Sequence, residues 1–351
     1  MTRASPRAIV LAAATACLLV PLLAPAQAQT VEEFYKTHAI TMLVGSGAGG
    51  GYDVYARAFA RFWADHIPGH PTIVPKSLPA AAGLAAASTL YNGAERDGSV
   101  IGAFTNGAAM DPLFGNPAAH YDALKFNWLG SIGKLENVCF TWHTSAVKTI
   151  AAARSREVVV AAAGATSNSA IVPKMLNALI GTRFKVVPGY DTASGLTMAV
   201  ERGEAEGICG LSWSTIKASR PHWIADYSLN VIVQMGLAKL RDLPNVPSAL
   251  DLVEDARGRQ VMELILLRQE AGRPFAAPPD APADRVAVLR HAFRETLADP
   301  EFVGAAAQEQ LEIEPMSGEA IAAMLAKAYG APKDIVARAA ELVYPAAPKA
   351  Q

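Results

Sequence analysis

The segment of this chain best suited to binding chemistry is glycine-rich and runs from Ser46 to Asp53 as Ser-Gly-Ala-Gly-Gly-Gly-Tyr-Asp. A strand pattern precedes the segment and a helix pattern follows it, so its backbone N–H groups are expected at a helix N-terminus. Such N–H groups and the helix dipole favour an anion, and Asp53 is expected to cap the helix and orient the loop. A flexible turn that binds nothing is the alternative.

Two nucleotide-binding patterns come close to this segment, and neither is satisfied. Gly45, Gly47 and Gly50 have the G-x-G-x-x-G spacing of dinucleotide-binding folds, but the strand that ends near Lys76 offers no acidic residue for a ribose. The Walker pattern fails as well, because no Gly-Lys-Ser/Thr follows the glycines. We therefore expect no cofactor.

A second loop of small polar residues runs from Gly164 to Ser169, again between a strand pattern and a helix pattern. The side chains of Ser167, Asn168 and Ser169, together with free N–H groups, suit a carboxylate. An ordinary helix cap would explain this loop alone, but two such loops in one chain favour an anion held between them. Further candidates lie just after the ends of other predicted strands, which is where open α/β sheets bind ligands. Each of these taken singly reads as a turn. These candidates are Asn106, Tyr190, Ser212 and Trp213.

Catalytic signatures are absent or weak in the sequence. It contains no H-E-x-x-H, C-x-x-C or G-x-S-x-G motif, and a Pro-Gly pair interrupts the helical spacing of His66 and His70. We therefore expect neither an enzyme nor a metal site. The alternative from another class is a secreted α/β hydrolase or acyltransferase that uses Ser212 or Ser167, for which spacing predicts no base.

The elements that must position these loops form two alternating series. Between residues 39 and 104, three strand patterns alternate with two helix patterns, and the alternation returns between 158 and 209. Each series indicates a parallel sheet with right-handed crossovers. Beyond residue 236 the chain reads as mostly helical, with patterns at 283–298 and 300–308 among others.

We therefore predict an α/β protein of two lobes, with two parallel-type sheets and a hinge of two crossing strands. If the late helices pack on the first series, lobe 1 comprises 29–131 and 236–351, and lobe 2 comprises 132–235. A cleft would lie between the lobes. The proline-dense stretch at 272–282 reads either as an unstructured linker or as an extended segment that carries the chain between lobes.

Residues 1–28 read as a secretory signal peptide. Two arginines precede an apolar run from Ala8 to Leu23, and Ala26-Gln27-Ala28 follows with small residues where a signal peptidase cuts. An uncleaved membrane anchor is the alternative, but the run is short for a span of ~20 residues and contains a proline. We therefore expect the mature chain in the periplasm.

The cysteines bear on the same compartment. Cys17 would leave with the signal, and Cys139 and Cys209 would remain in strand patterns of the second series. An oxidising compartment favours a disulfide between them, while two separate buried thiols are the alternative.

Composition excludes two classes of function. The 31 Lys+Arg residues nearly balance the 32 Asp+Glu residues, so we expect no basic face and no nucleic-acid partner. Much of the 51% hydrophobic content is alanine rather than long apolar runs, which argues against a polytopic membrane protein.

The segment from Gly49 to Arg57 resembles the first loop of the substrate-binding receptors of tripartite tricarboxylate transporters, also called Bug proteins. Later segments fit the same family, and the resemblance covers essentially the whole chain after the signal. They are Pro79 to Gly83 with Asp97-Gly98, Gly189-Tyr190, Glu201 to Glu204, and Asp299 to Phe302.

The resemblance implies a periplasmic-binding-protein type 2 fold whose two lobes close on a small organic carboxylate held by backbone N–H groups. It also implies a monomer that delivers its ligand to integral-membrane transporter subunits; a periplasmic sensor partner is a further alternative. By motif match, one loop contributes Ser46, Gly49, Gly50 and Asp53, and the opposite loop contributes Ser167, Asn168 and Ser169.

Two departures from the family pattern bear on specificity. Tyr52 stands where a small Thr or Ser is common, so a large phenol at the cleft edge is expected to reshape the ligand site. The stretch from Pro79 to Gly83 has lost two glycines, which puts a close backbone approach there in doubt. Tyr52 and Trp213 hint at an apolar end of the ligand, and the sequence assigns no cation to the cleft.

Overall fold

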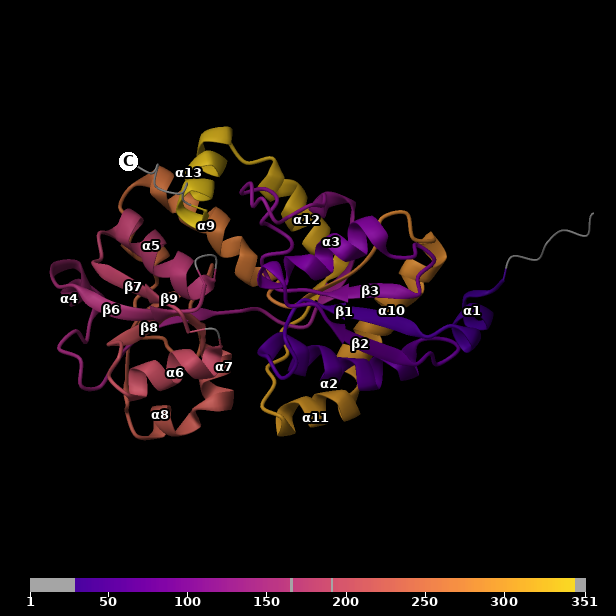
Figure 1. Ribbon diagram of the computed structural model, residues 1–351, viewed down its shortest axis with the longest axis horizontal. Coiled ribbons are helices and arrows are strands. Elements are labelled where there is room, and N and C mark those ends of the chain that lie inside the picture. The colour runs from indigo at the N-terminus through magenta and orange to yellow at the C-terminus, as the bar shows by residue number, and fades with distance from the viewer. Residues whose placement is uncertain (1–28, 165–166, 191, 345–351) are drawn as a thin grey trace, which may run out of the picture.

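The computed structural model describes residues 29–164, 167–190 and 192–344. The expected signal peptide at 1–28 lies outside these residues. Two lobes lie along the long axis, and each contains its own sheet (Figure 1). Within the described ranges, no helix is both long enough and apolar enough to cross a membrane.

The lobe 1 sheet has a parallel part and an antiparallel part, in the order β11-β4-β10-β3-β1-β2. The parallel strands are β1 (Ile40–Val44), β2 (Ile73–Ser77) and β3 (Val100–Ala103). The antiparallel strands are β4 (Asn127–Ser131), β10 (Pro274–Ala277) and β11 (Met316–Ser317). The proline-dense stretch therefore contains a central strand, β10, rather than an unstructured linker.

Helices cover both faces of this sheet. One face holds an aromatic cluster in which Phe59 of α2 (Gly51–His66) packs against Phe275 of β10 and Phe293 of α10 (Ala283–Ala298). These side chains are almost fully buried, which fixes α2 and therefore the loop that precedes it. The other helical segments of lobe 1 are α1 (Val31–Thr37), η1 (Ala81–Gly83), α3 (Leu84–Gly93), η2 (Ala123–Lys125), α11 (Pro300–Gln308) and α12 (Gly318–Tyr329).

The lobe 2 sheet is also mixed, in the order β7-β6-β8-β5-β9. Its strands are β5 (Asn137–Trp142), β6 (Val158–Ala162), β7 (Phe184–Pro188), β8 (Gly207–Ser212) and β9 (Leu229–Met235). Its helical segments are α4 (Ile150–Ser155), α5 (Asn168–Ile180), α6 (Ala193–Glu201), α7 (Trp213–Ser219), α8 (Pro221–Ala225), η3 (Leu250–Leu252) and α9 (Ala256–Glu270).

Cys139 and Cys209 face each other on the antiparallel strands β5 and β8 and form a disulfide with an S–S distance of 2.07 Å. Both side chains are completely buried in the lobe 2 core. The bond therefore links the two strands from within the sheet.

The predicted two-lobed α/β fold is confirmed, with two differences in detail. Both sheets are mixed rather than parallel, because the chain runs antiparallel to its neighbours where it passes between lobes. The chain leaves lobe 1 at 132–136, between β4 and β5, but it returns at 271–273, between α9 and β10, and not near 236.

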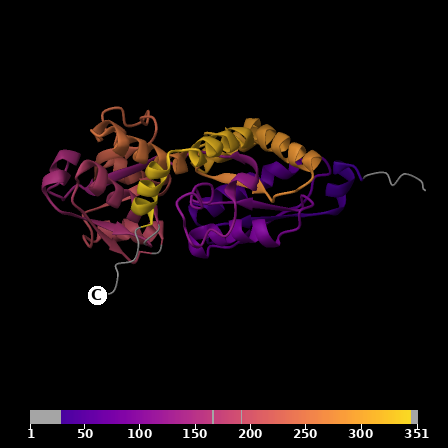
Figure 2. The ribbon, with the colours of Figure 1, turned by 90° about the horizontal axis from the view of Figure 1, so that it is seen from above.

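A third crossing follows α12. The last helix, α13 (Lys333–Val343), packs on α9 and α5 of lobe 2, as both ribbon views show (Figures 1 and 2). The expected assignment of 236–351 to lobe 1 therefore differs from the observed packing at α9 and α13. The physical reason is that both helices contact α5 of lobe 2 and each other, and each buries apolar side chains, such as Ile265 of α9 and Leu342 of α13.

Candidate ligand-binding site

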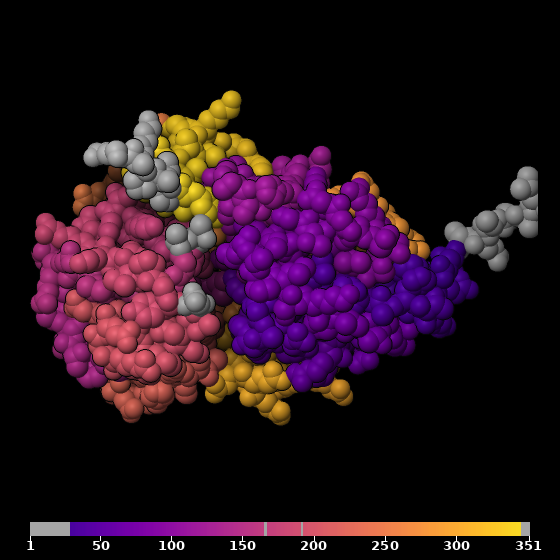
Figure 3. Space-filling view, viewed as in Figure 1, coloured from indigo at the N-terminus to yellow at the C-terminus, as the bar shows by residue number. Residues whose placement is uncertain are grey.

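A cleft of about 910 Å³ lies between the two lobes. Figure 3 shows the face of the molecule on which the surfaces of the lobes meet. From lobe 1 the cleft is lined by the loop between β1 and α2 and by residues after β3. From lobe 2 it is lined by the residues that begin α5, α6 and α7. Strand ends of both sheets therefore open onto one space.

The first glycine-rich loop is held from behind by Asp53. The Asp53 carboxylate accepts a hydrogen bond from the Gly49 N–H at 2.9 Å and pairs with Arg57 Nε at 2.8 Å. Burial raises the pKa of Asp53, but the hydrogen bonds from Arg57 and Gly49 outweigh this effect, so the pKa lies below its ordinary value. Asp53 is 2% exposed and does not line the cleft, so it orients the loop from behind.

The front of this loop leaves N–H groups available. Gly50 occupies the cap position of α2, and no side chain accepts a hydrogen bond there. The first N–H groups of a helix have no partner within the helix, so those of Gly51 and Tyr52, two residues that line the cleft, are free to donate. A Cβ at position 50 would lie 2.6 Å from Ser46 Oγ and 3.1 Å from the Gly47 carbonyl oxygen, so the Ser46 side chain would have to move.

The second loop has the same construction. Ser167 is the cap residue of α5, yet its hydroxyl donates back to the Gly164 carbonyl at 2.7 Å instead of capping the helix. Ser167 and Asn168 line the cleft. Ser169 does not, because its hydroxyl is buried behind the loop and accepts from the Ala163 N–H at 3.0 Å. The neighbours at 165–166 lie outside the described residues.

A polar wall closes the lobe 1 side of the cleft. The Tyr52 hydroxyl donates to Asn106 Oδ1 and accepts from the Asn106 N–H, both at 3.2 Å. Burial raises the pKa of the Tyr52 phenol, although the hydrogen bond from Asn106 and the charges of Arg273 and Arg268 oppose the rise. Tyr52 and Asn106 thus lie together on the cleft wall. Tyr52 is in α2, which follows β1, and Asn106 comes after β3.

Besides Asp53 and Ser169, three further predicted residues lie outside the cleft lining. The Tyr190 hydroxyl donates to Glu204, and the Trp213 indole N–H donates to Asp242 at 3.0 Å. Ser212 is buried and caps α7 by accepting from the Thr215 N–H. Thr215 and its neighbour Ser214 line the cleft in place of these residues.

Among the described residues, no base lies within hydrogen-bond reach of the Ser212 hydroxyl. Its side-chain partners are the hydroxyls of Ser214 and Thr215, at 3.0 and 2.8 Å. A nucleophilic serine needs a base such as histidine within hydrogen-bond reach. Nor do three or more His, Cys, Asp or Glu side chains gather in the described ranges as they would around a metal ion.

Sequence reasoning missed the cations of the cleft. Arg220, Arg268 and Arg273 line it, the last two from the end of α9 and the crossing that follows. Arg268 forms a buried ion pair with Asp111 at 3.0 Å, and Arg220 pairs with Glu201 at 3.3 Å. The only signal in the sequence was the position of two arginines beside the proline-dense stretch, which does not by itself point to the glycine loops.

Comparisons with known proteins bear on the fold. No family model and no curated relative matches the chain. Among solved structures, a TctC solute-binding protein from Polaromonas is similar, with a TM-score of 0.65 and 20% identity, and the match covers 88% of this chain and 99% of that one. The periplasmic binding protein BugD matches with a TM-score of 0.63 and 20% identity over 87% and 96%.

MatC from Rhodopseudomonas palustris, solved with bound malate, matches with a TM-score of 0.62 and 18% identity over 88% and 99%. At these identities the likenesses establish the fold, which is that of bilobed periplasmic binding proteins.

Proposed function

We propose that this protein is a periplasmic solute-binding protein that captures a small organic carboxylate between its lobes and delivers it to a tripartite tricarboxylate-type transporter. One observation carries the proposal: two helix N-termini, those of α2 and α5, border the same cleft from opposite lobes without a side-chain cap. Uncapped helix N–H groups and the helix dipole bind anions.

The solved neighbours support the same class of ligand. MatC was solved with malate, and a further R. palustris neighbour, at a TM-score of 0.63 and 17% identity, was solved with adipate. Both ligands are organic acids. The expected periplasmic location and the expected membrane subunits belong to this proposal, as does the signal peptide at 1–28.

The mechanism follows from the position of the two loops. Each loop belongs to a different lobe, so an anion contacts both sets of N–H groups only when the lobes approach each other. The ligand therefore binds the closed arrangement more tightly than the open one and shifts the population towards it. Closure also excludes water, which strengthens hydrogen bonds to the carboxylate.

A thermal-shift screen of organic acids, followed by calorimetry on each hit, tests the proposal. A ligand at ~100 times its dissociation constant adds about 2.7 kcal/mol to the free energy of unfolding, which is readily detected. If no acid raises the unfolding temperature of the folded protein, the proposal fails.

Two variants of one residue separate charge from size. Gly51 lines the cleft, and a Cβ there meets no atom within 4 Å, so Gly51→Asn and Gly51→Asp both fit the fold. The Asp side chain favours the helix N-terminus but repels a bound carboxylate. We expect Gly51→Asp to lose acid binding at least ten times more strongly than Gly51→Asn. Equal losses in the two variants would contradict an anion at this loop.

Delivery to a transporter is tested in cells. Deletion of the gene is expected to abolish uptake of the acid identified in the screen, and expression of the full chain is expected to restore it. Unchanged uptake together with loss of a transcriptional response to the acid would favour the periplasmic sensor instead.

A further inference from the structure

A left-handed turn follows β2 on the lobe 1 side of the cleft. Ala81 and Ala82, the first two residues of η1, have φ angles of 54° and 55°, and Gly83 follows with a φ of 90°. The left-handed region is costly for a residue with a Cβ, which crowds the following carbonyl oxygen, whereas glycine adopts it freely. The two consecutive alanines therefore hold strain that glycine would not.

Both ends of this turn are fixed to β1 and the residue after it. The Leu78 N–H donates to the Val44 carbonyl at 2.7 Å. At the other end Gly83 lies directly against Gly45, since a Cβ on Gly83 would be 2.1 Å from the Gly45 carbonyl oxygen. The close backbone approach that the loss of two glycines placed in doubt is therefore present. A turn held at both ends leaves its two alanines little freedom to relax.

Packing within the protein does not compensate the strain. Ala81 and Ala82 are both exposed, so their methyl groups bury little apolar surface. The Ala82 carbonyl accepts a hydrogen bond from Thr105 Oγ1 at 3.3 Å, a contact that the backbone of a glycine would make equally well. Strained residues that persist without such compensation are concentrated at functional sites.

The cleft distinguishes the two alanines. Six non-glycine residues in the described ranges have a positive φ, and of these only Ala82 lines the cleft. Pro79 and Thr105 line the same lobe 1 side. Ala81 shares the conformation and the exposure of Ala82 but does not line the cleft. Ala82 is thus a strained residue on the ligand's side of the turn, and Ala81 is its counterpart outside the cleft.

We propose that Ala82 determines which shape of acid the cleft accepts. Its methyl group, fixed by the turn, limits the width of the ligand beside the lobe 1 wall, so that straight-chain acids bind and acids with a methyl branch at this wall are rejected. A rigid wall cannot relieve an overlap of one methyl group by moving away. The inference rests on the proposed function, because it names the shape of the acid that the same cleft takes.

The test compares ligands that differ by one methyl branch. Succinate, adipate and hexanoate are each paired with an analogue that carries one methyl branch, and both members are titrated calorimetrically. The pair whose straight-chain member binds the wild type most tightly is then titrated into the variants. We expect the wild type to prefer the straight chain by ~10-fold or more. Ala82→Gly, which removes the methyl group, is expected to reduce this preference to about three-fold or less.

Ala81→Gly is the matched control, because it relieves the same kind of strain outside the cleft. Both glycine variants are expected to raise the unfolding temperature by about 1–3 °C, since glycine suits a positive φ. Only Ala82→Gly should change the preference between straight and branched acids. A role of Ala82 in folding alone would move the unfolding temperature and leave this preference unchanged.

A second pair of variants tests the opposite change. Asparagine tolerates the left-handed region and is larger than alanine, so it fits the turn and narrows the cleft. Ala82→Asn is expected to weaken binding of the straight-chain acid by ~10-fold or more, while Ala81→Asn binds as the wild type does. This pair gives an answer that does not depend on the flexibility of glycine.

Three outcomes would overturn the inference. The wild type could bind straight and branched acids equally well, Ala82→Gly could keep the same preference as Ala81→Gly, or Ala82→Asn could bind the straight-chain acid as tightly as the wild type. In each case acid binding by the wild type persists, so the proposed function stands while the inference fails. Absence of binding to any acid would instead remove both.

Discussion

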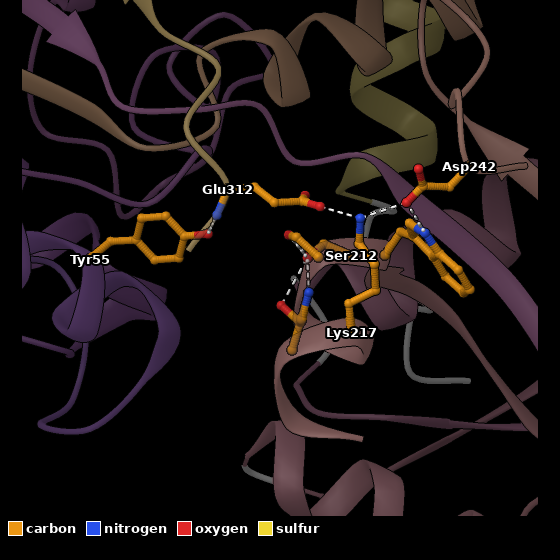
Figure 4. A network of polar contacts seen from close by, with 8 residues as sticks. Tyr55, Ser212, Lys217, Asp242 and Glu312 are labelled. Atoms are coloured by element: carbon orange, nitrogen blue, oxygen red, sulfur yellow. Dashed lines mark hydrogen bonds and ion pairs between the residues drawn. The ribbon is translucent and has the colours of Figure 1, made fainter. Parts of the chain in front are cut away.

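Lys217 of α7 and Glu312, which follows α11, form an ion pair across the two lobes (Figure 4). Lys217 also contacts Asp242 of lobe 2 at 2.6 Å, and the Glu312 N–H donates to the Tyr55 hydroxyl of α2 at 2.9 Å. Burial lowers the pKa of Lys217, but its bonds to Asp242 and Glu312 outweigh this and raise the pKa above its ordinary value. The pair therefore joins a helix that lines the cleft to the opposite lobe.

Breaking this pair is expected to weaken ligand binding modestly. Lys217→Gln removes an attraction that exists only while the lobes are close, so the open population rises and the apparent affinity falls. The side chains are 35% and 47% exposed, and such pairs contribute about 0.2–1 kcal/mol, which corresponds to an affinity loss of up to about five-fold. Calorimetry measures the affinity, and small-angle scattering measures the radius of gyration.

The control uses an ion pair between a lysine and an aspartate of the same lobe. Lys239 contacts Asp251 at 3.4 Å, both in lobe 2, so Lys239→Gln should leave the ligand affinity unchanged. A double-mutant cycle with Glu312→Gln then isolates the pair. If the effects of the two substitutions add without coupling, the ion pair does not hold the lobes together.

Glu136, at the end of the first crossing, is expected to make the stability of the folded protein depend on pH. Burial raises its pKa, and Glu314 raises it further. A raised folded-state pKa means that the unfolded chain releases this proton at lower pH than the folded chain does. Stability is therefore lost as pH rises from the unfolded pKa through the folded one, and Glu136→Gln should raise the unfolding temperature at pH 7.

The same comparison at pH 3 provides the control for Glu136. The carboxylic acid is protonated in both states there, so wild type and Glu136→Gln should unfold at the same temperature. The gain at pH 7 is expected to stay below about 1 kcal/mol because the group is only half buried. A destabilised Glu136→Gln at pH 7 would show that the ionised form is favoured at the crossing.

Local patterns predicted most elements because their causes are local. The helices α10 and α11 begin and end where the sequence places them, at 283–298 and 300–308, since Asp299 caps α11 and Pro300 opens it. The packing of α13 was not predictable in this way. An amphipathic helix has an apolar face that fits either lobe, and only the packed structure decides which one.

In the candidate site, too, features with local causes were predictable and features that depend on long-range packing were not. The glycine loop and the Ser167 loop were predictable because they combine a strand end, a helix start and small residues within a few positions. Arg273 was not, because its position in the cleft depends on a crossing that brings it beside Tyr55, far away in the sequence. Trp213 was misplaced, since proximity to a loop serine does not reveal that its indole bonds to Asp242.

The disulfide is expected to stabilise lobe 2 without contributing to ligand binding. Its sequence separation is 70 residues, and a chain-entropy argument gives about 4 kcal/mol for a loop of this length. Cys139→Ala/Cys209→Ala should lower the free energy of unfolding in urea by roughly this amount while the ligand affinity stays within two-fold. Since both sulfurs are buried, the folded wild type should also resist reduction.

A reducing agent added after unfolding provides the matched control for the disulfide. The reduced wild type should then have the same urea midpoint as the double variant. Equal midpoints for oxidised wild type and double variant would mean that the bond does not form in the purified protein.

Asp53 connects the stability of α2 with the shape of the anion loop. Asp53→Asn keeps the size of the side chain but weakens its bonds to Gly49 and Arg57. Loss of charge-assisted hydrogen bonds should cost roughly 1.5–3 kcal/mol of stability, and a loosened loop should weaken acid binding about ten-fold or more. Asp284→Asn, an acidic residue in the first turn of α10 outside the cleft, is the control and should leave binding unchanged.

The pH dependence of Asp53 distinguishes this account from a general loss of folding. Its folded-state pKa is lowered, so its contribution to stability is fully present above the ordinary pKa and is lost as pH falls through the folded one. The difference in unfolding temperature between wild type and Asp53→Asn should thus be constant from pH 8 to pH 5 and disappear in strong acid. A difference that persists in strong acid would mean that size or packing, rather than the charge of Asp53, holds the loop.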